Sequence, residues 1–585
     1  MKTAQLKSEM LFLLTLVTFF LAGRSNAQEK VAGQPNFLVI VADDMGFSDM
    51  GAFGGEINTP NLDKLAQEGT RYTNFYVAPT CSPTRSMLLT GMDNHLVGLG
   101  NMYENTAPNQ LDKPGYEGYL RTDFPTIAEI LKENGYHTYM AGKWHLGKGR
   151  GHLPAARGFE RSFSMLSGMG DYYSMKGTDS DVEVNHFSED GEYVRELPKK
   201  YYATTTFTDK IIDYIDSNKA DGKPFFAYLA HQAPHDPLAV PNKWLRKYDG
   251  VFDKGWDVLR DERMERMVEL GILEEKTALG ERFWYVPGFD KLKPAAQVTT
   301  ARKMEVYAAV LDYMDMEIGR LVNYLEDNGL KDNTYIIFFS DNGPETRNKA
   351  DDFKNYPASN NANFMAKNYT HGYQNWGRQG SFTSYGPSWA QVSATPFKAA
   401  KGSLYEGGIR SPLIVVSPNS KEKGSINPSA LMHVKDVPAT LLELANINGE
   451  KYRMQGKSWV PMMTGKSQSP RTSEDYLACE LFGNMSVRKG DWKLVKMDEP
   501  YGNGGWELYN IINDPGERSD LAQDHPEKVE EMAQLWDEYV ATNNVILPNR
   551  DVYDGLKDKL PPKPPVYAPG YPRGGETVPE IDGKQ

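Results

Sequence analysis

The chain of 585 residues has very few cysteines and no excess of positive charge. Its two cysteines, Cys81 and Cys479, cannot supply a four-cysteine zinc site or a framework of several disulfides. With 65 basic and 78 acidic residues the formal net charge is −13, which gives no reason to expect nucleic acid or an anionic membrane as a partner. Beyond the N-terminal segment, no apolar run reaches the ~20 residues of a membrane-spanning helix. The chain does have 40 % hydrophobic residues, and we therefore expect a globular, enzymatic protein.

The N-terminus has the pattern of a signal peptide. Two lysines precede an apolar run from Met10 to Ala22, and the small residues Ser25 and Ala27 suit cleavage by a signal peptidase. A membrane anchor is the alternative, but the run is too short for the ~20 residues that span a bilayer. We therefore expect residues 1–27 to be removed during export to the periplasm or the medium, with no membrane attachment afterwards.

Short apolar runs alternate with amphipathic stretches over the first 460 residues. The runs that predict buried strands are Asn36–Ala42, Tyr136–Ala141, Phe225–Ala230, Tyr335–Phe339 and Leu413–Val416. The stretches that predict helices are Asn61–Glu68, Pro125–Asn134 and Arg302–Asp327. This alternation predicts an α/β fold with a large mixed, mostly parallel sheet flanked by helices on both faces. Two aperiodic segments, 172–201 and 348–393, are expected to shape the rim of a pocket.

The pattern changes near residue 461. Short strand-like pieces predict a small antiparallel sheet, and Pro526–Ala541 predicts a helix that covers it. We therefore expect a catalytic α/β domain over 28–460 and a smaller C-terminal α+β subdomain over 461–585. The subdomain ends in a Pro-rich tail at 561–575, which is more typical of an extended surface segment than of a folded element.

Acidic and amide side chains follow two of the predicted strands. Asp43 and Asp44 come directly after the first strand, and Asp341 and Asn342 come after Tyr335–Phe339. Open α/β sheets bind ligands beyond the carboxyl ends of their strands, where oxygen ligands would suit a hard divalent cation. Three carboxylates at neighbouring strand ends would lie close together and repel one another unless a cation offset their charge. Either group alone could be a solvated loop or a helix cap, but together they predict a metal site.

Cys81 is expected to be a reactive residue. It precedes the helix-like stretch Arg85–Thr90, and a helix N-terminus favours developing negative charge. The alternative is a Cys81–Cys479 disulfide, the usual state of two cysteines in an exported protein. Against it, Cys479 lies in an apolar strand-like piece that indicates the core.

These residues belong to a series of motifs that resembles the type I sulfatases of the alkaline-phosphatase-like superfamily. The signature of that family is CSPTR with a downstream TG, here at 81–85 and 90–91. Further motifs in the family's order are NTPNLD at 58–63, GKWHLG at 142–147, PH at 234–235, DNG at 341–343, KG at 401–402 and EGGIR at 406–410. The segment YGPSWAQ at 385–391 is similar to bacterial arylsulfatases of the Pseudomonas type.

The resemblance implies a modified residue and a metal ion. In the family, a formylglycine-generating maturation enzyme converts the cysteine to Cα-formylglycine. Calcium would be held by Asp43, Asp44, Asp341, Asn342 and the modified Cys81, although oxygen ligands alone would also allow Mg²⁺. A cation and basic side chains suit sulfate esters, because the charged oxygens of the ester repel a nucleophile.

The resemblance also implies roles for the basic residues. Arg85 and Lys143 would hold the hydrated aldehyde, and His145 would be the base for sulfate release. His235 would protonate or orient the leaving oxygen. Lys401 would contact the sulfate as a point-charge oxyanion binder.

Some neighbouring residues remain open or are given structural roles. Lys398 competes with Lys401 for the sulfate contact. An extended segment would place Lys143 and His145 on the same side, with Trp144 opposite. Two further groups are expected to be structural: the histidines His95, His137 and His231, and Glu406-Gly407-Gly408 as a turn with special backbone angles. The aromatic segment 371–376 could line an aromatic or sugar pocket, but simple loop packing explains it equally well.

The sequence therefore predicts an exported, calcium-dependent sulfuric-ester hydrolase that acts on aryl or related organic sulfates. A polysaccharide sulfatase would use the same chemistry, and a phosphonate or phosphodiester hydrolase shares the CxPxR motif, the metal and the formylglycine. A glycan-binding protein that keeps the fold with an unmodified Cys81 belongs to a different class. The expected partners are a small-molecule or glycan sulfate ester and the maturation enzyme.

Overall fold

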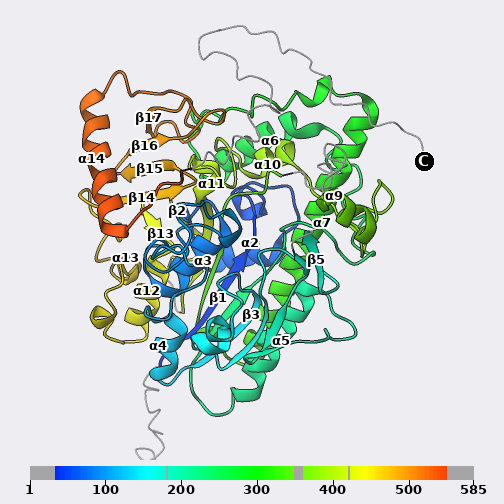
Figure 1. The fold of residues 1–585 in the computed structure, drawn as a ribbon, viewed down its shortest axis with the longest axis vertical. Helices are drawn as coiled ribbons and strands as arrows, with labels where there is room; N and C mark the ends of the chain where they lie inside the picture. The colour runs from blue at the N-terminus through cyan, green and yellow to red at the C-terminus, as the bar shows by residue number, and fades with distance from the viewer. Residues whose placement is uncertain (1–32, 180–181, 348–359, 419–421, 550–585) are drawn as a thin grey trace, which may run out of the picture.

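A computed structural model describes residues 33–179, 182–347, 360–418 and 422–549. An eleven-stranded sheet crosses the molecule (Figure 1). Its strand order is β12 (Ser425–Asn427), β2 (Thr70–Tyr76), β11 (Arg410–Val416), β10 (Thr334–Ser340), β1 (Asn36–Ala42), β9 (Phe225–Ala230), β3 (His137–Lys143), β4 (Arg161–Met165), β7 (Phe187–Glu189) and β8 (Glu192–Tyr193), with β13 (Met432–His433) beside β2. The expected signal peptide and the Pro-rich tail lie outside the described residues.

The centre of the sheet is parallel. β10, β1, β9, β3 and β4 form consecutive parallel pairs, whereas β11 runs antiparallel to β10 and β2, and β7 runs antiparallel to β4 and β8. Ala42 pairs with Ser340 at the carboxyl ends of β1 and β10. The polar residues that follow these two strands therefore meet at one edge of the sheet.

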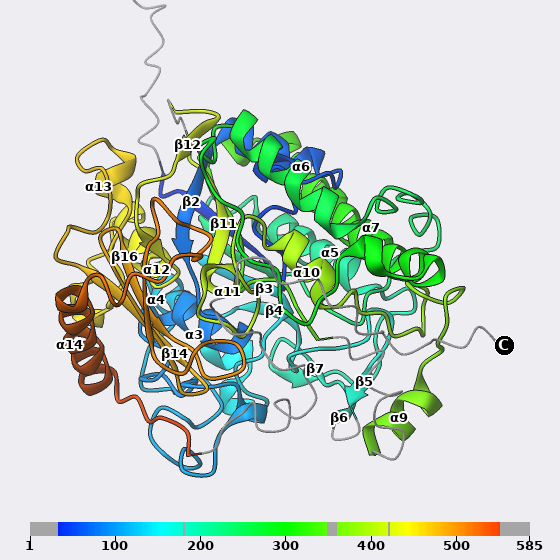
Figure 2. The ribbon, with the colours of Figure 1, turned by 90° about the horizontal axis from the view of Figure 1, so that it is seen from above.

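Helices cover both faces of the sheet, as the sequence predicts. Alternate residues of β1 belong to two hydrophobic clusters, one with Leu38 and Ile40 and the other with Phe37 and Val39. The first cluster includes α2 (Pro60–Glu68), α5 (Ala203–Asn218) and α7 (Pro294–Asp327). The second includes α3 (Cys81–Thr90), α4 (Ile127–Glu133) and α12 (Asp436–Leu444). Figure 2 shows α5 and α7 on one side of the molecule and α3, α4 and α12 on the other.

The C-terminal part forms the expected small antiparallel sheet. Its strands are β14 (Tyr476–Leu481), β15 (Asn484–Lys489), β16 (Trp492–Lys496) and β17 (Trp506–Asn510), and α14 (Pro526–Asn543) packs on them. A buried ion group ties this sheet to the large one. Lys493 Nζ lies 2.8 Å from Oε1 of Glu406 and 2.8 Å from Oε1 of Glu517.

Several elements differ from the sequence prediction. α7 begins at Pro294 rather than near Arg302. Its first turns are only partly buried, so the apolar periodicity on which the prediction depended is weak there. The segment 172–201 is not irregular, because it contains β5 (Lys176–Asp179), β6 (Val182–Val184), β7 and β8. These strands are too short for an alternating pattern to be recognised.

The remaining helices lie in the connections. They are α6 (Gly255–Glu269), α9 (Asn360–Asn368), α10 (Pro387–Ser393), α11 (Glu406–Ile409) and α13 (Val460–Met463). The expected turn at Glu406-Gly407-Gly408 is wrong, since these residues begin α11. The glycines are needed for space: a Cβ on Gly407 would lie 2.4 Å from Ala399 O, and one on Gly408 would lie 2.1 Å from Ser403 O. Within the described residues, no helix is both long and apolar enough to cross a bilayer.

Candidate active site

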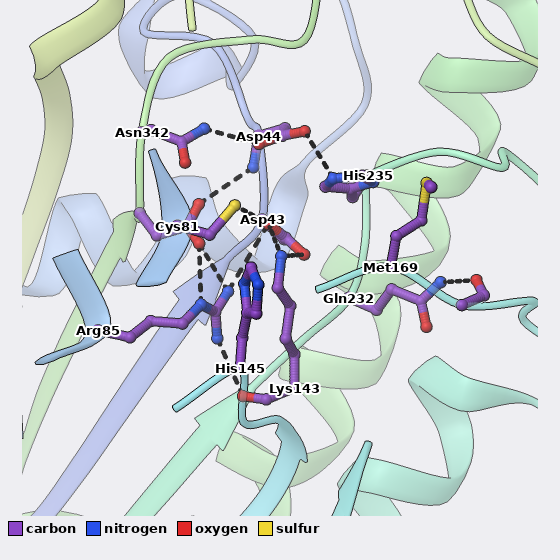
Figure 3. A network of polar contacts seen from close by, with 12 residues as sticks. Asp43, Asp44, Cys81, Arg85, Lys143, His145, Met169, Gln232, His235 and Asn342 are labelled. Carbon is purple, nitrogen blue, oxygen red and sulfur yellow. Dashed lines mark hydrogen bonds and ion pairs between the residues drawn. The ribbon is translucent and has the colours of Figure 1, made fainter. Parts of the chain in front are cut away.

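Four polar residues meet at the carboxyl ends of β1 and β10, and Figure 3 labels three of them, Asp43, Asp44 and Asn342. The backbone N–H of Asp44 donates to Asp341 Oδ1 at 3.3 Å, and Asn342 Nδ2 donates to Asp44 Oδ1 at 2.6 Å. Asp43, Asp44, Asp341 and Asn342 are all buried. Burial raises the pKa of Asp43 and, more strongly, that of Asp44, where neighbouring carboxylates add to the effect.

Cys81 faces this group from the first residue of α3. Its Sγ lies 3.5 Å from Asp43 Oδ1, and ligand atoms of Cys81, Asp43, Asp44 and His235 all lie within 4.8 Å of one another. Burial and the nearby Asp341 raise the pKa of the Cys81 thiol well above its usual value. Cys81 and Cys479 are both free.

Two basic side chains, Arg85 and Lys143, reach the carboxylates from below in Figure 3. Arg85 Nη2 lies 2.7 Å from Asp341 Oδ2, and Arg85 Nη1 donates to Lys143 O at 3.0 Å. Lys143 Nζ lies 2.7 Å from Asp43 Oδ2. Burial opposes the charge of Lys143, but the attraction of Asp43, together with that of Cys81 and Asp341, outweighs burial and raises the pKa of this lysine. These buried pairs fix the carboxylates in place.

Lys401 is the lysine that reaches the same group. Its Nζ lies 2.8 Å from Asp44 Oδ1, 3.3 Å from His235 Nε2 and 3.3 Å from Glu345 Oε2. Lys398, the competing candidate, instead lies over the Tyr405 ring, 3.9 Å from its centroid. Sequence reasoning missed Glu345, although its position two residues after the DNG motif was a usable signal.

His145 does not continue an extended strand. β3 ends at Lys143, and His145 has a left-handed φ of 56°. The predicted extended segment is therefore wrong here, although Trp144 does turn away into the core, where it packs on Phe159. His145 Nε2 lies 3.1 Å from Glu104 Oε1. Burial lowers the pKa of His145 despite the opposing attraction of Glu104, which favours the neutral form of the ring.

The other histidines lie outside this group. His231 is buried, neither of its ring nitrogens has a hydrogen-bond partner among the described residues, and burial lowers its pKa to about 3. His95 is held between Asp93 and Glu480, and His137 is held between Glu160 and Asp221. None of the three lines the cavity above Cys81.

A cavity of about 450 Å³ opens over Cys81, His145, His235 and Lys401. This volume lies within the ~300–1,000 Å³ of typical small-ligand pockets. Other side chains of the wall, which sequence reasoning missed, are Met102, Glu104, Lys148, Ser167, Met169, Arg347 and Phe482. Phe482 comes from the turn between β14 and β15 and has a left-handed φ of 60°, which is rare for an aromatic residue.

Among the described residues, the two segments that were expected to form the pocket rim contribute little to it, and residues 348–359 of the second segment lie outside the described part of the chain. Within 172–201, only Thr178 lines the cavity, and no described residue of 348–393 does so. In the segment 371–376, Trp376 packs under Lys303, whose Nζ is 5.3 Å from the ring centroid. The rim comes instead from loops near residues 102–105 and 167–169 and from the distant turn at Phe482. Pairings this distant leave no local pattern in the sequence.

Comparisons with known proteins agree with this geometry. The sulfatase family model matches residues 35–447, and the model of the C-terminal part of N-sulphoglucosamine sulphohydrolase matches residues 399–544. An uncharacterised sulfatase of Schizosaccharomyces pombe is 38 % identical over 88 % of this chain and 94 % of its own. An arylsulfatase of Klebsiella aerogenes is 37 % identical over 76 % of this chain and 94 % of its own.

More distant proteins share the fold. An N-acetylglucosamine-6-O-sulfatase of Bacteroides thetaiotaomicron is 27 % identical over 90 % of each chain. The crystal structure of Ps i-CgsB in complex with k-i-k-neocarrahexaose superposes with a TM-score of 0.62 at 23 % identity, covering 90 % of this chain and 97 % of the other. The family-model match, the two relatives above 35 % identity and the cluster around Cys81 establish that this chain belongs to the sulfatases of the alkaline-phosphatase-like superfamily, enzymes that hydrolyse sulfate esters.

Proposed function

We propose that this sulfatase is an exported enzyme that hydrolyses aryl or related small organic sulfates, with Cys81 oxidised to Cα-formylglycine and Ca²⁺ beside it. The observation that carries the proposal is the position of Cys81, whose Sγ is buried 3.5 Å from Asp43 Oδ1 at the floor of the cavity. The reacting residue thus faces the carboxylates on one side and the substrate space on the other.

The residues present fit a divalent cation. Asn342 Oδ1 is buried without a hydrogen-bond partner among the described residues, as expected of an oxygen that is kept for a ligand. Asp43, Asp44 and Asp341 add hard oxygen donors. Calcium follows from the family resemblance, and Mg²⁺ is the alternative that the same donors allow.

Charge also favours a cation. The carboxylates at this site are those of Asp43, Asp44, Asp341 and Glu345, and the cationic side chains paired with them are those of Arg85, Lys143 and Lys401. With every carboxylate ionised, four negative and three positive charges leave a net charge of −1, which would repel a monoanionic sulfate ester. A bound dication changes the sum to +1 and would supply Lewis-acid stabilisation of charge on the sulfate oxygens.

The unmodified thiol is poorly suited to attack. A thiolate is the reactive form of cysteine, and burial together with Asp341 raises the pKa of Cys81. Formylglycine hydrate would supply a nucleophilic hydroxyl for sulfur and a second hydroxyl whose deprotonation releases sulfate. This supports the oxidised form of Cys81 as the active one.

Arg85 and Lys143 would orient residue 81. Both are fully buried and held by carboxylates, so their positive charges are fixed beside Cys81 before substrate arrives. Preorganised charge of this kind needs no rearrangement in the transition state. His145 would accept the proton that is lost when sulfate is released.

Lys401 and His235 would act on the substrate. Lys401 Nζ and His235 Nε2 lie 3.3 Å apart, and both residues line the cavity. Lys401 would offset the charge of the sulfate oxygens, and His235 would protonate or orient the leaving oxygen.

The residues that line the cavity indicate which kind of leaving group it accepts. Met102, Met169 and Phe482 form apolar parts of the wall, which suits an aromatic ring. A carbohydrate sulfate is the second candidate, because Lys148, Ser167 and other polar residues also line the cavity and a relative is an N-acetylglucosamine-6-O-sulfatase. The two candidates differ in the leaving group, which is an aromatic ring in the first and a sugar in the second, so the preferred substrate distinguishes them.

The experiment compares substrates with protein of verified aldehyde content. Mass spectrometry of the peptide around Cys81 should show replacement of sulfur by oxygen with loss of two hydrogens, and Cys81→Ala should be inactive. We expect turnover of p-nitrophenyl sulfate to exceed that of a phosphodiester analogue and of monosaccharide and polysaccharide sulfates. A thiol at position 81 in a fully active preparation would refute the proposed nucleophile.

Export and maturation complete the proposal. Residues 1–27 have the pattern of a signal peptide, and Cys81 is buried in the folded chain. A maturation enzyme would therefore have to act before folding is complete. Expression of the full chain in a bacterial host, followed by fractionation and N-terminal sequencing, should find mature protein outside the cytoplasm that begins after Ala27.

A further inference from the structure

The two ring nitrogens of His145 have different surroundings. Nε2 lies 3.1 Å from Oε1 of Glu104, whereas Nδ1 is buried and has no hydrogen-bond partner among the described residues. A carboxylate only accepts hydrogen bonds, so the proton of a neutral ring belongs on Nε2. The free lone pair then lies on Nδ1.

The ring has little freedom to turn. A Cβ on Gly168 would lie 2.5 Å from His145 Cε1 and 2.7 Å from Nε2, so the glycine backbone packs directly against this edge of the ring. Figure 3 shows the ring standing between Arg85 and Lys143 below Cys81. These contacts hold the ring in one orientation at the floor of the cavity.

Glu104 is held by a structured turn rather than by a free loop. It is the middle residue of the 3-10 turn Tyr103–Asn105, in which the Asn105 N–H donates to Met102 O at 2.9 Å. Asn101 Nδ2 donates to Asn105 O at 3.0 Å. Tyr103 occupies the space above Gly118, where a Cβ would lie 2.4 Å from its ring. The turn therefore directs the Glu104 side chain to His145.

We propose that Glu104 is a positioning residue that holds His145 as the Nε2–H tautomer and leaves Nδ1 to take the proton during sulfate release. The inference rests on the proposed function of His145. In the release step, a hydroxyl on residue 81 gives its proton to Nδ1 and its oxygen forms the aldehyde double bond. The bond from the same carbon to the sulfate oxygen breaks, and its electron pair leaves with sulfate. The imidazolium that forms is stabilised by the Glu104 carboxylate.

The first test reads the tautomer directly and needs no activity. The chain with an unmodified Cys81 is labelled with ¹⁵N-histidine, and the His145 resonances are assigned by their loss in His145→Gln. We expect the shifts of an Nε2–H ring in the wild-type chain. We expect a move toward a mixture of tautomers in Glu104→Ala, and little change in Glu104→Gln, which keeps an acceptor. An Nδ1–H ring in the wild type would overturn the inference.

The second test separates sulfate release from attack on the substrate. With aldehyde-bearing enzyme and p-nitrophenyl sulfate, Glu104→Ala should lower kcat about 10- to 100-fold, a size typical of partners that orient a functional histidine. kcat/KM should change less than about threefold, because release follows the first irreversible step. A burst of about one p-nitrophenol per aldehyde-bearing site should precede the slow steady state.

Three comparisons complete the test. Asp112→Asn removes an exposed carboxylate of the same loop region and should behave like the wild type. Adding Glu104→Ala to His145→Ala should cost nothing further, because Glu104 acts through His145. An additive loss, a loss confined to kcat/KM, or an unchanged kcat would each contradict the inference. If verified aldehyde enzyme turned over no sulfate ester at all, the proposed function would fail, while the tautomer experiment would still judge Glu104.

Discussion

Lys401 Nζ lies 2.8 Å from Asp44 Oδ1, although the two residues are 357 positions apart in the sequence. Lys401→Ala should reduce kcat/KM for p-nitrophenyl sulfate at least about 100-fold, because it removes a fixed cation from the developing oxyanion. Lys398→Ala, three residues away on the Tyr405 ring, is the matched control and should stay within about threefold. Equal losses in the two variants would mean that Lys401 has no special part in sulfate binding.

Removal of the cation should weaken the fold as well as the activity. A ligand at 100 times its Kd stabilises the native state by about 2.7 kcal/mol, so Ca²⁺ should raise the Tm of chelator-treated protein measurably. Asn342→Ala removes a donor without leaving a buried charge unpaired, and it should reduce this rise. The exposed Asp332→Asn should keep it. A Tm that is insensitive to Ca²⁺ and Mg²⁺ in the wild type would argue against the metal site.

Phe482 should select the leaving group. Phe482→Ala should lower kcat/KM for p-nitrophenyl sulfate about tenfold, because apolar contact with the ring is lost, and should leave a small alkyl sulfate almost unaffected. Phe482→Gly also relieves the left-handed backbone at φ 60°, whose cost is of order 1 kcal/mol or more. It should therefore be at least as stable as Phe482→Ala in urea unfolding. An equal loss on both substrates would exclude a role in selection.

His95 should make the stability depend on pH. It is buried between Asp93 and Glu480, with Tyr539 and Lys435 also next to Asp93. Burial opposes its charge, but hydrogen bonds to the two carboxylates outweigh this and raise the pKa of His95 to about 9. Because this folded-state pKa lies above the ordinary ~6.5, protonated His95 stabilises the folded protein. The contribution is complete below pH ~6.5 and is lost as the pH rises through 9.

The amount at stake is on the order of 3 kcal/mol, from a rise of about 2.5 pKa units at 1.36 kcal/mol each. Chemical denaturation of wild type and His95→Gln between pH 6 and 10 measures it. The wild type should lose its advantage toward pH 10, whereas the variant should give a flatter curve. The exposed His525→Gln should follow the wild type. Parallel curves for wild type and His95→Gln would contradict the assignment.

The sequence was most informative where polar functional residues come directly after a predicted strand. Asp43 and Asp341 could be placed together because each comes directly after a long apolar run, and parallel strands end at the same edge. The same reasoning could not find Glu104 or Phe482. Their places depend on loops whose side chains meet the cavity from about 40 and 340 residues away from His145, and no local periodicity records such a contact.

The ends of some helices and strands were predicted incorrectly for a different reason. The start of α7 at Pro294 and the short strands around Phe187 carry too few buried residues to show a period. At Gly407, sequence reasoning took a glycine as a sign of unusual backbone angles, whereas close packing against Ala399 O requires it. A glycine needed for its backbone angles and a glycine needed for close packing look the same in the sequence. Only the neighbouring atoms in the folded structure distinguish the two roles.

The buried pairing of Lys493 with Glu406 has a consequence for engineering. Glu406 begins α11, next to the strand β11 of the large sheet, while its lysine partner comes from β16. Exchange of Lys493 for a neutral residue in the intact chain would leave the buried Glu406 carboxylate with Arg410 as its remaining ion-pair partner, at a cost of up to several kcal/mol. Chimaeras that exchange the last hundred residues between relatives should therefore retain a cation at this position. If the grafted segment lacked this cation, the segment and the region around Glu406 in the recipient chain would have to be redesigned together.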